Sequence, residues 1–245
     1  MININPEGPY AHIVEMITSR KWDKLLTPPI NINSDIVKEF YANAMPLCDK
    51  RDMDTRFTYT TMVQGKTIHF DRDTINAYLD NPLELPPPED PTIPTLCEYG
   101  RKEEARAWNH NRIVRDILLP GKRYNRGKNE EPTTANFSDM TLEAAIIFQF
   151  LVHNVVPRSH VTTTPTSATP LIWHIIRGGE VDVARIISDQ LKHVALSGLL
   201  HKATKLSFPG FIMGLVHAQD VQIPACDEKI KGVVSDRYIH HHARK

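Results

Sequence analysis

The sequence is poor in cysteine, and the positions of the few cysteines exclude two classes of small protein. Its 245 residues contain only Cys48, Cys97 and Cys226, which are far apart and outside any Cys-x-x-Cys spacing. This pattern argues against a disulfide framework and against a zinc ribbon. It is typical of a reducing compartment, so we expect an intracellular protein of the nucleus or the cytoplasm.

Long hydrophobic runs and a net charge are also missing. The longest apolar stretch, residues 144–156, is interrupted by Gln149, His153 and Asn154, and is too short and too polar to span a bilayer. The N-terminus lacks the basic-then-apolar pattern of a signal peptide. Acidic and basic residues balance at 29 each, so the overall charge draws the chain neither to nucleic acid nor to an anionic membrane. We expect no membrane contact.

The sequence lacks the motifs of the common catalytic and cofactor sites. It has no His-Glu-x-x-His pair and no Gly-x-Ser-x-Gly turn. Residues 121–123 lack the other positions of a P-loop, and the glycines at 178–179 follow a predicted helix where a dinucleotide turn needs a strand. The histidine tract at 240–242 binds metal only adventitiously by this interpretation. We therefore predict no catalytic residue, no cofactor and no functional metal site, which is not the pattern of an enzyme.

One pair of carboxylates keeps a second interpretation open. Asp71 and Asp73 follow the predicted strand 66–70, and a distant acid such as Glu143 or Asp182 would complete the three carboxylates of a two-metal nuclease. The same two aspartates precede a predicted helix, where carboxylates cap free backbone N–H groups and interact with the helix dipole. We favour the capping role, with a divergent metal-dependent transposase or nuclease as the alternative.

Proline-rich and polar segments divide the chain into parts. The connector 82–100 separates an N-terminal part, residues 1–81, from residues 101–223, which we expect to belong to the same domain, and a polar tail follows at 224–245. Residues 56–70 carry strand-forming side chains on both sides of a Gln-Gly turn and predict one small β-hairpin. We predict a mainly α-helical fold with this single hairpin.

Apolar spacing and capping residues place the individual helices. Ser34 is the predicted N-cap of the second helix. Two stretches rich in turn-forming and small polar residues, 124–136 and 161–169, are predicted loops. The predicted helices lie at 10–22, 35–44, 72–79, 103–119, 139–155, 170–177, 183–194 and 209–218.

A local excess of positive charge between residues 101 and 128 is the best candidate for nucleic-acid contact. This segment holds nine basic and three acidic residues, with Trp108 and Tyr124 interleaved as rings that could stack on bases. The alternative is a solvated helix face and a basic loop, with Trp108 in the core. The candidate contact residues are Arg112, Arg115, Lys122, Arg123, Arg126 and Lys128.

Five short blocks occur in an order that is typical of one protein family. They are WDKLL at 22–26, IVKEFYAN at 36–43, GKTIHF at 65–70, LIWHIIRGG at 171–179 and LSFPGFI at 206–212. In this order they resemble the plant family described as "putative plant transposon protein", over roughly residues 10–221. The resemblance implies an origin in a plant mobile element of the retroelement type, but it implies no established activity.

Three functions follow from these observations. We expect a non-catalytic, transposon-derived module that binds DNA or RNA through residues 101–128, or binds other element-encoded proteins. The first alternative is the divergent nuclease or transposase described above. The second is a self-assembling, capsid-like helical module, which would present an exposed apolar patch larger than a few hundred Å².

Overall fold

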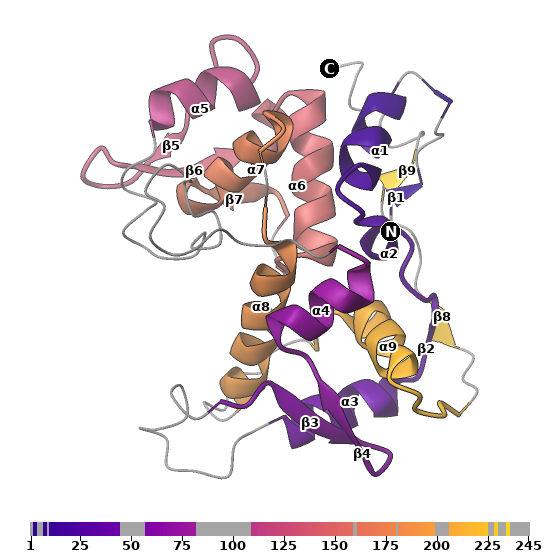
Figure 1. Ribbon diagram of the computed structural model, residues 1–245. Coiled ribbons are helices and arrows are strands. Elements are labelled where there is room, and N and C mark those ends of the chain that lie inside the picture. Colours follow the sequence, from indigo (N-terminus) through magenta and orange to yellow (C-terminus); the bar gives the residue numbers. More distant parts are fainter. Residues whose placement is uncertain are drawn as a thin grey trace, which may run out of the picture.

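The described part of the chain confirms the predicted fold class. The computed structural model describes residues 2–3, 7–8, 10–44, 57–81, 109–158, 161–179, 181–198, 206–224, 228–229 and 234–235. Within these residues the fold is mainly α-helical with small sheets of two or three strands (Figure 1). The predicted connector 82–100, the basic residues before 109 and most of the tail lie outside the described residues.

Most of the helices lie close to the positions that their apolar spacing predicts, but the helix predicted at 10–22 ends at Thr18, and the short helix Asp23–Leu26 was not predicted. No helix in the described ranges combines the length and the apolar character that a bilayer crossing requires. In chain order the described α-helices are α1 (Ala11–Thr18), α2 (Asp23–Leu26), α3 (Ser34–Asn43), α4 (Arg72–Leu79), α5 (His110–Ile117), α6 (Leu142–Asn154), α7 (Thr169–Ile176), α8 (Val183–Gly198) and α9 (Pro209–Ala218).

Two short strand pairs bring the ends of the chain against the helical body. β1 (Ile2–Asn3) runs parallel to β9 (Val234–Ser235), and β2 (Asn31–Ile32) runs antiparallel to β8 (Glu228–Lys229). The N-terminal segments therefore lie beside segments more than 190 residues later in the sequence. Figure 1 shows both pairs along the same side of the molecule as α1 and α2.

The predicted hairpin is confirmed as β3 (Thr60–Val63) and β4 (Lys66–His69). These strands pair antiparallel with Thr60 opposite His69 and Val63 opposite Lys66. The two turn residues, Gln64 and Gly65, both have positive φ angles, of 48° and 76°. A two-residue turn of this kind has the twist that matches the two strands, which explains why a Gln-Gly pair closes the hairpin.

The two predicted loops at 124–136 and 161–169 are wrong in part, because they contain a second sheet. β5 (Asn125–Arg126), β6 (Pro132–Asn136) and β7 (Thr163–Pro165) form an antiparallel sheet in that order. Thr134 lies opposite Pro165, and Ala135 lies opposite Thr164. These strands are short and rich in threonine and proline, so local sequence alone resembles a loop. Pairing between segments about 30 residues apart is what makes them strands.

One predicted helix cap is also displaced. Asn33, and not Ser34, caps α3, because its side-chain oxygen accepts the N–H groups of Asp35 and Ile36 at 3.0 and 3.4 Å. Ser34 is the first residue of the helix itself. The sequence offered two adjacent polar residues, both of which are good N-caps, so composition could not choose between them.

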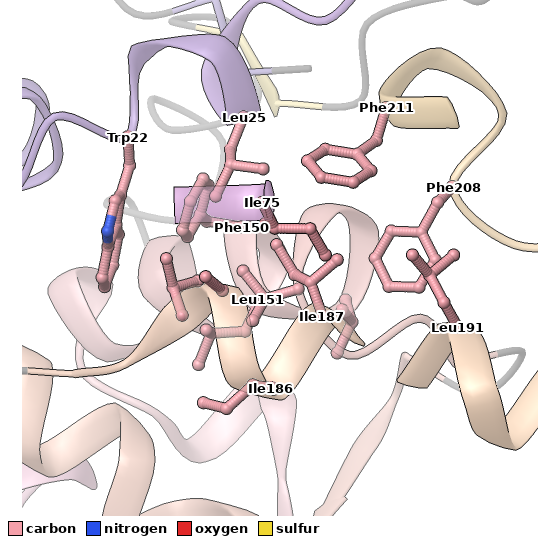
Figure 2. Packing of buried hydrophobic residues seen from close by; sticks show 14 of the residues in the cluster. Trp22, Leu25, Ile75, Phe150, Leu151, Ile186, Ile187, Leu191, Phe208 and Phe211 are labelled. Carbon is pink, nitrogen blue, oxygen red and sulfur yellow. The ribbon is translucent and has the colours of Figure 1, made fainter. Parts of the chain in front are cut away.

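A single hydrophobic cluster contains residues from both sides of the undescribed stretch 82–108. α6 is buried on almost every side, as its nearly uniform apolar sequence predicts. The Trp22 ring stacks on Phe150 of α6 with ring centroids 5.9 Å apart and planes within 9°. Figure 2 shows Phe208 and Phe211, which begin α9, packed in the same core as Leu25 and Ile75. The core thus joins α2, α4, α6, α8 and α9.

Candidate nucleic-acid interface

Helix α5 carries two of the candidate basic residues and is formed by clear local signals. Asn109 caps it by accepting the N–H group of Arg112 at 3.1 Å, and it ends before the Pro-Gly pair at 120–121. Ile113 and Ile117 are buried one turn apart, so Arg112 and Arg115 lie on the exposed part of the helix. The helix therefore presents its arginines to solvent because its aliphatic face packs into the core.

The contact that docks α5 on α7 is half-exposed and consists of one tryptophan, one carboxylate and two arginines. The indole N–H of Trp173 and the guanidinium of Arg177, both on α7 or directly after it, donate to the same oxygen of Asp116, each at 2.7 Å. These hydrogen bonds, first from Trp173 and then from Arg177, hold the pKa of Asp116 below its usual value. Arg112 lies over the Trp173 ring at 5.4 Å from its centroid. The arrangement fixes α5 against α7, as Figure 1 shows.

Two of the six candidates form ion pairs with neighbouring carboxylates. Lys122 forms an ion pair with Asp139 at 2.9 Å, and this contact, followed by a hydrogen bond from Asn136, holds the pKa of Asp139 below its usual value. Arg126 forms an ion pair with Glu130 at 3.3 Å and also donates to the Glu130 backbone carbonyl. Lys122 and Arg126 therefore stabilise the β5–β6 region locally, and the positive charge of each is partly compensated by its acidic partner.

Of the other four candidates, three are exposed cations without an ion pair to a described acid. Arg115, Arg123 and Lys128 are exposed, and no hydrogen bond or ion pair joins their side chains to another described residue. They lie on α5, after the 120–121 turn and in the β5–β6 turn. The structure thus reduces the predicted six-residue surface to three uncompensated charges plus Arg112, which is held over Trp173. We call these four residues the basic surface.

The expected base-stacking role of Tyr124 is wrong. Its ring is buried, and its hydroxyl lies 2.9 Å from the Thr169 hydroxyl on α7. Burial raises the pKa of this phenol. Trp108, the other ring proposed for stacking, lies outside the described residues, as do Arg101, Lys102 and Arg106. The ring that lies beside Arg112 is the half-buried Trp173. Sequence analysis did not predict this contact, because Trp173 is about 60 residues away from Arg112 in the chain.

The carboxylates of the alternative nuclease site have structural partners. Both oxygens of Asp71 accept hydrogen bonds at the start of α4, from the backbone N–H groups of Asp73 and Thr74 and from the Thr74 hydroxyl. This is the capping role that the sequence favours. The guanidinium of Arg72 pairs with Asp73 at 2.6 Å and with Asp182 at 2.5 Å, so these two carboxylates share one arginine.

Glu143, the other distant acid considered, lies in the first turn of α6, where a carboxylate interacts favourably with the helix dipole. Across the described ranges of the chain there is no group of three or more histidine, cysteine, aspartate or glutamate side chains that could hold a metal ion.

The described residues form a mainly helical domain with a buried hydrophobic core and carry the four cations of the basic surface. Comparison with known families is more specific. Residues 18–222 match the family described as "putative plant retrotransposon-related domain", which is most of the chain, and the protein belongs to this family. The matched range includes the whole basic surface. Neither a curated protein nor a solved structure matches the chain. The expected origin in a plant mobile element is therefore confirmed.

Proposed function

We propose that this retrotransposon-related domain is a non-catalytic nucleic-acid-binding module that contacts phosphate groups through its basic surface. The observation that carries the proposal is the set of three exposed cations, Arg115, Arg123 and Lys128, without an acidic partner in the described chain. An exposed, uncompensated arginine or lysine gains most from a phosphate, because it gives up no existing ion pair.

The docking of α5 supports the same proposal. Because Asp116 is bonded to both Trp173 and Arg177, α5 is held in one orientation against α7. The arginines of α5 and the basic residues after it are thus presented by a fixed scaffold, which lowers the entropy lost on binding. Contacts of this kind read the nucleic-acid backbone and not its sequence, so we expect weak discrimination between sequences.

The expected affinity follows from the number of contacts. Three phosphate contacts on duplex DNA give a slope of about −2.7 for the logarithm of the binding constant against the logarithm of salt concentration. Raising the salt from ~50 to ~200 mM should therefore weaken binding by roughly 40-fold. Dissociation constants should lie in the range of non-specific binding, about 10⁻⁴ to 10⁻⁶ M at physiological salt.

The test is fluorescence anisotropy with labelled single- and double-stranded DNA and with RNA, at several salt concentrations and with Mg²⁺ present. The test variant replaces Arg115, Arg123 and Lys128 by glutamine, and we expect binding at least tenfold weaker and a flatter salt dependence. The matched control loses the same charge elsewhere, with glutamine at the exposed positions 21, 38 and 66. Equal weakening in both variants, or no binding at ~50 mM salt, would refute the basic surface.

The same samples test the absence of catalysis. Denaturing gels show whether the labelled strands remain intact in Mg²⁺ and in Mn²⁺. We expect no cleavage. Strand cleavage that disappears in the Asp71→Asn and Asp73→Asn variants would favour the metal-dependent nuclease over the binding module. Sedimentation of the free protein as a large oligomer would favour the capsid-like alternative.

A further inference from the structure

A partly open cavity of about 150 Å³ lies where three separate segments of the chain meet. One wall comes from α2 and the Pro28–Pro29 pair that follows it, a second from the C-terminal end of α6, and a third from the beginning of α9. Figure 2 shows three of the lining side chains, Leu25, Phe208 and Phe211, on the core side of this junction. None of these residues belongs to the basic surface.

The backbone that forms the walls of the cavity is closely packed and conformationally restricted. Gly210 approaches the Pro29 carbonyl so closely that an added Cβ would lie 2.8 Å from its oxygen. Phe208 has a left-handed backbone conformation, with φ of 58°, and its side chain is nevertheless buried. Prolines at 28, 29 and 209 fix their own φ angles and offer no N–H donor. The cavity is therefore pre-formed, and its proline walls are apolar.

The cavity contains no uncompensated charge. The ammonium group of Lys24 is bonded to the Tyr78 carbonyl and forms an ion pair with Asp80 at 2.7 Å. Burial lowers the pKa of His153, which favours the neutral imidazole. A charged ligand would lose its hydration without gaining a counter-charge, which is costly. The cavity thus favours a neutral ligand.

Two polar residues at the end of α6 retain hydrogen-bond acceptors. The Nε2 atom of His153 lies 3.1 Å from the Gln149 side-chain oxygen, so Nε2 carries the proton and Nδ1 is an acceptor. Asn154 donates its amide to the Phe150 carbonyl at 3.0 Å, which leaves its side-chain oxygen as an acceptor. Among the residues that the structure describes, neither acceptor receives a hydrogen bond.

From these features we infer that the cavity is a binding site for a small neutral aromatic molecule that carries one N–H or O–H donor. The volume suits a single ring system, because an apolar cavity of similar size in another protein takes up benzene. Aromatic rings at 208 and 211 and the proline rings supply apolar contact, and the side-chain oxygen of Asn154 accepts the hydrogen bond from the ligand's donor. A few polar groups in an apolar cavity are the usual composition of a ligand site.

Indole is the probe that tests this site, with N-methylindole as the same ring without a donor and benzoate as a charged ring. Each is titrated into the isotope-labelled full chain, and amide chemical shifts are recorded. We expect saturable shifts confined to amides around the cavity, such as those of Leu25, Asn154, Gly210 and Phe211. The dissociation constant for indole should be on the order of 1 mM, given its few heavy atoms. N-methylindole and benzoate should bind at least fivefold more weakly.

The matched variants are Asn154→Leu and Asn43→Leu. Both asparagines end a helix and donate their side-chain amides to a backbone carbonyl, but only Asn154 lines the cavity. Asn154→Leu should remove the preference for indole over N-methylindole, whereas Asn43→Leu should keep it. No saturable shift at ~5 mM indole, or equal binding of the three probes, would overturn the site. The comparison of probes uses the unaltered chain, so it decides the question even where Asn154→Leu fails to fold.

Discussion

Removal of the buried carboxylate of Asp182 should destabilise the fold more than any exposed charge change. The side chain of Asp182 is fully buried, with 0% exposure. Its Oδ2 atom pairs with Arg72 at 2.5 Å, and this contact joins α8 to α4. Its other oxygen accepts the N–H group of Arg185 at 3.0 Å and so caps α8. Asp182→Ala therefore removes an ion pair and a helix cap at once.

The magnitude follows from these two contacts. Removing one partner of a buried ion pair costs roughly 3–5 kcal/mol, and losing a cap costs about 1 kcal/mol. The guanidinium of Arg72 is 25% exposed and keeps its contact with Asp73, so the lost pair lies toward the low end. We expect Asp182→Ala to lower the free energy of unfolding by about 4 kcal/mol and the Tm by roughly 8–16 °C. Asp182→Asn, which keeps an oxygen for the cap, should cost about 3 kcal/mol.

Urea unfolding followed by circular dichroism measures both values. Asp73→Ala is the control, because this carboxylate pairs with the same arginine but is 83% exposed, and it should cost less than about 1 kcal/mol. If Asp182→Ala lowers the free energy of unfolding by less than ~1 kcal/mol, or if the control lowers it equally, burial does not determine the strength of this contact.

Three further predictions test individual packing and capping contacts. Gly214→Ala places a Cβ 2.0 Å from the Tyr78 hydroxyl oxygen, so it should lower the free energy of unfolding by about 1–3 kcal/mol in urea, and an unchanged midpoint would contradict the packing. Burial alone would raise the pKa of Asp71, but hydrogen bonds, led by those from Thr74, hold this pKa below its usual value. Asp71 therefore contributes stability that is present above the unfolded pKa of 3.8 and is lost as the pH falls through the folded value, and Asp71→Asn should reduce this acid sensitivity in thermal scans. Tyr124→Phe should lower the free energy of unfolding by about 1 kcal/mol through the lost hydrogen bond and leave nucleic-acid affinity unchanged, whereas weaker binding would restore a contact role for this ring.

Local signals predicted much of the fold because they depend on neighbouring residues. The helix at 209–218 begins at its proline as expected, and Asp71 caps α4 as expected. The β5–β6–β7 sheet could not be predicted in this way, because Ala135 pairs with Thr164 across a long helix. Its strands are short and lack the alternating pattern that identifies a half-buried strand.

For the candidate interface, the sequence predicted which residues are basic but not the contacts that these residues make. Sequence identified the excess of basic residues but not which of them are neutralised, since Asp139, the partner of Lys122, lies outside the basic segment. It could not show that Tyr124 packs inward or that Trp173 packs against α5, because both depend on the docking of α7. Three-dimensional contacts therefore reduced the candidate set and added the tryptophan.

The two proposed sites lie toward opposite ends of one buried helix. Lys122, the neighbour in sequence of Arg123 of the basic surface, pairs with Asp139, which precedes the first turn of α6. The acceptors of the cavity lie on His153 and Asn154 at the last turn of the same helix. A helix of 13 residues separates its ends by about 20 Å. At that distance, with no shared side chain, effects of substitution at the two sites should add. Loss of indole binding would therefore leave the basic surface intact, and loss of nucleic-acid binding would leave the cavity intact, so each proposal stands or fails by its own measurement.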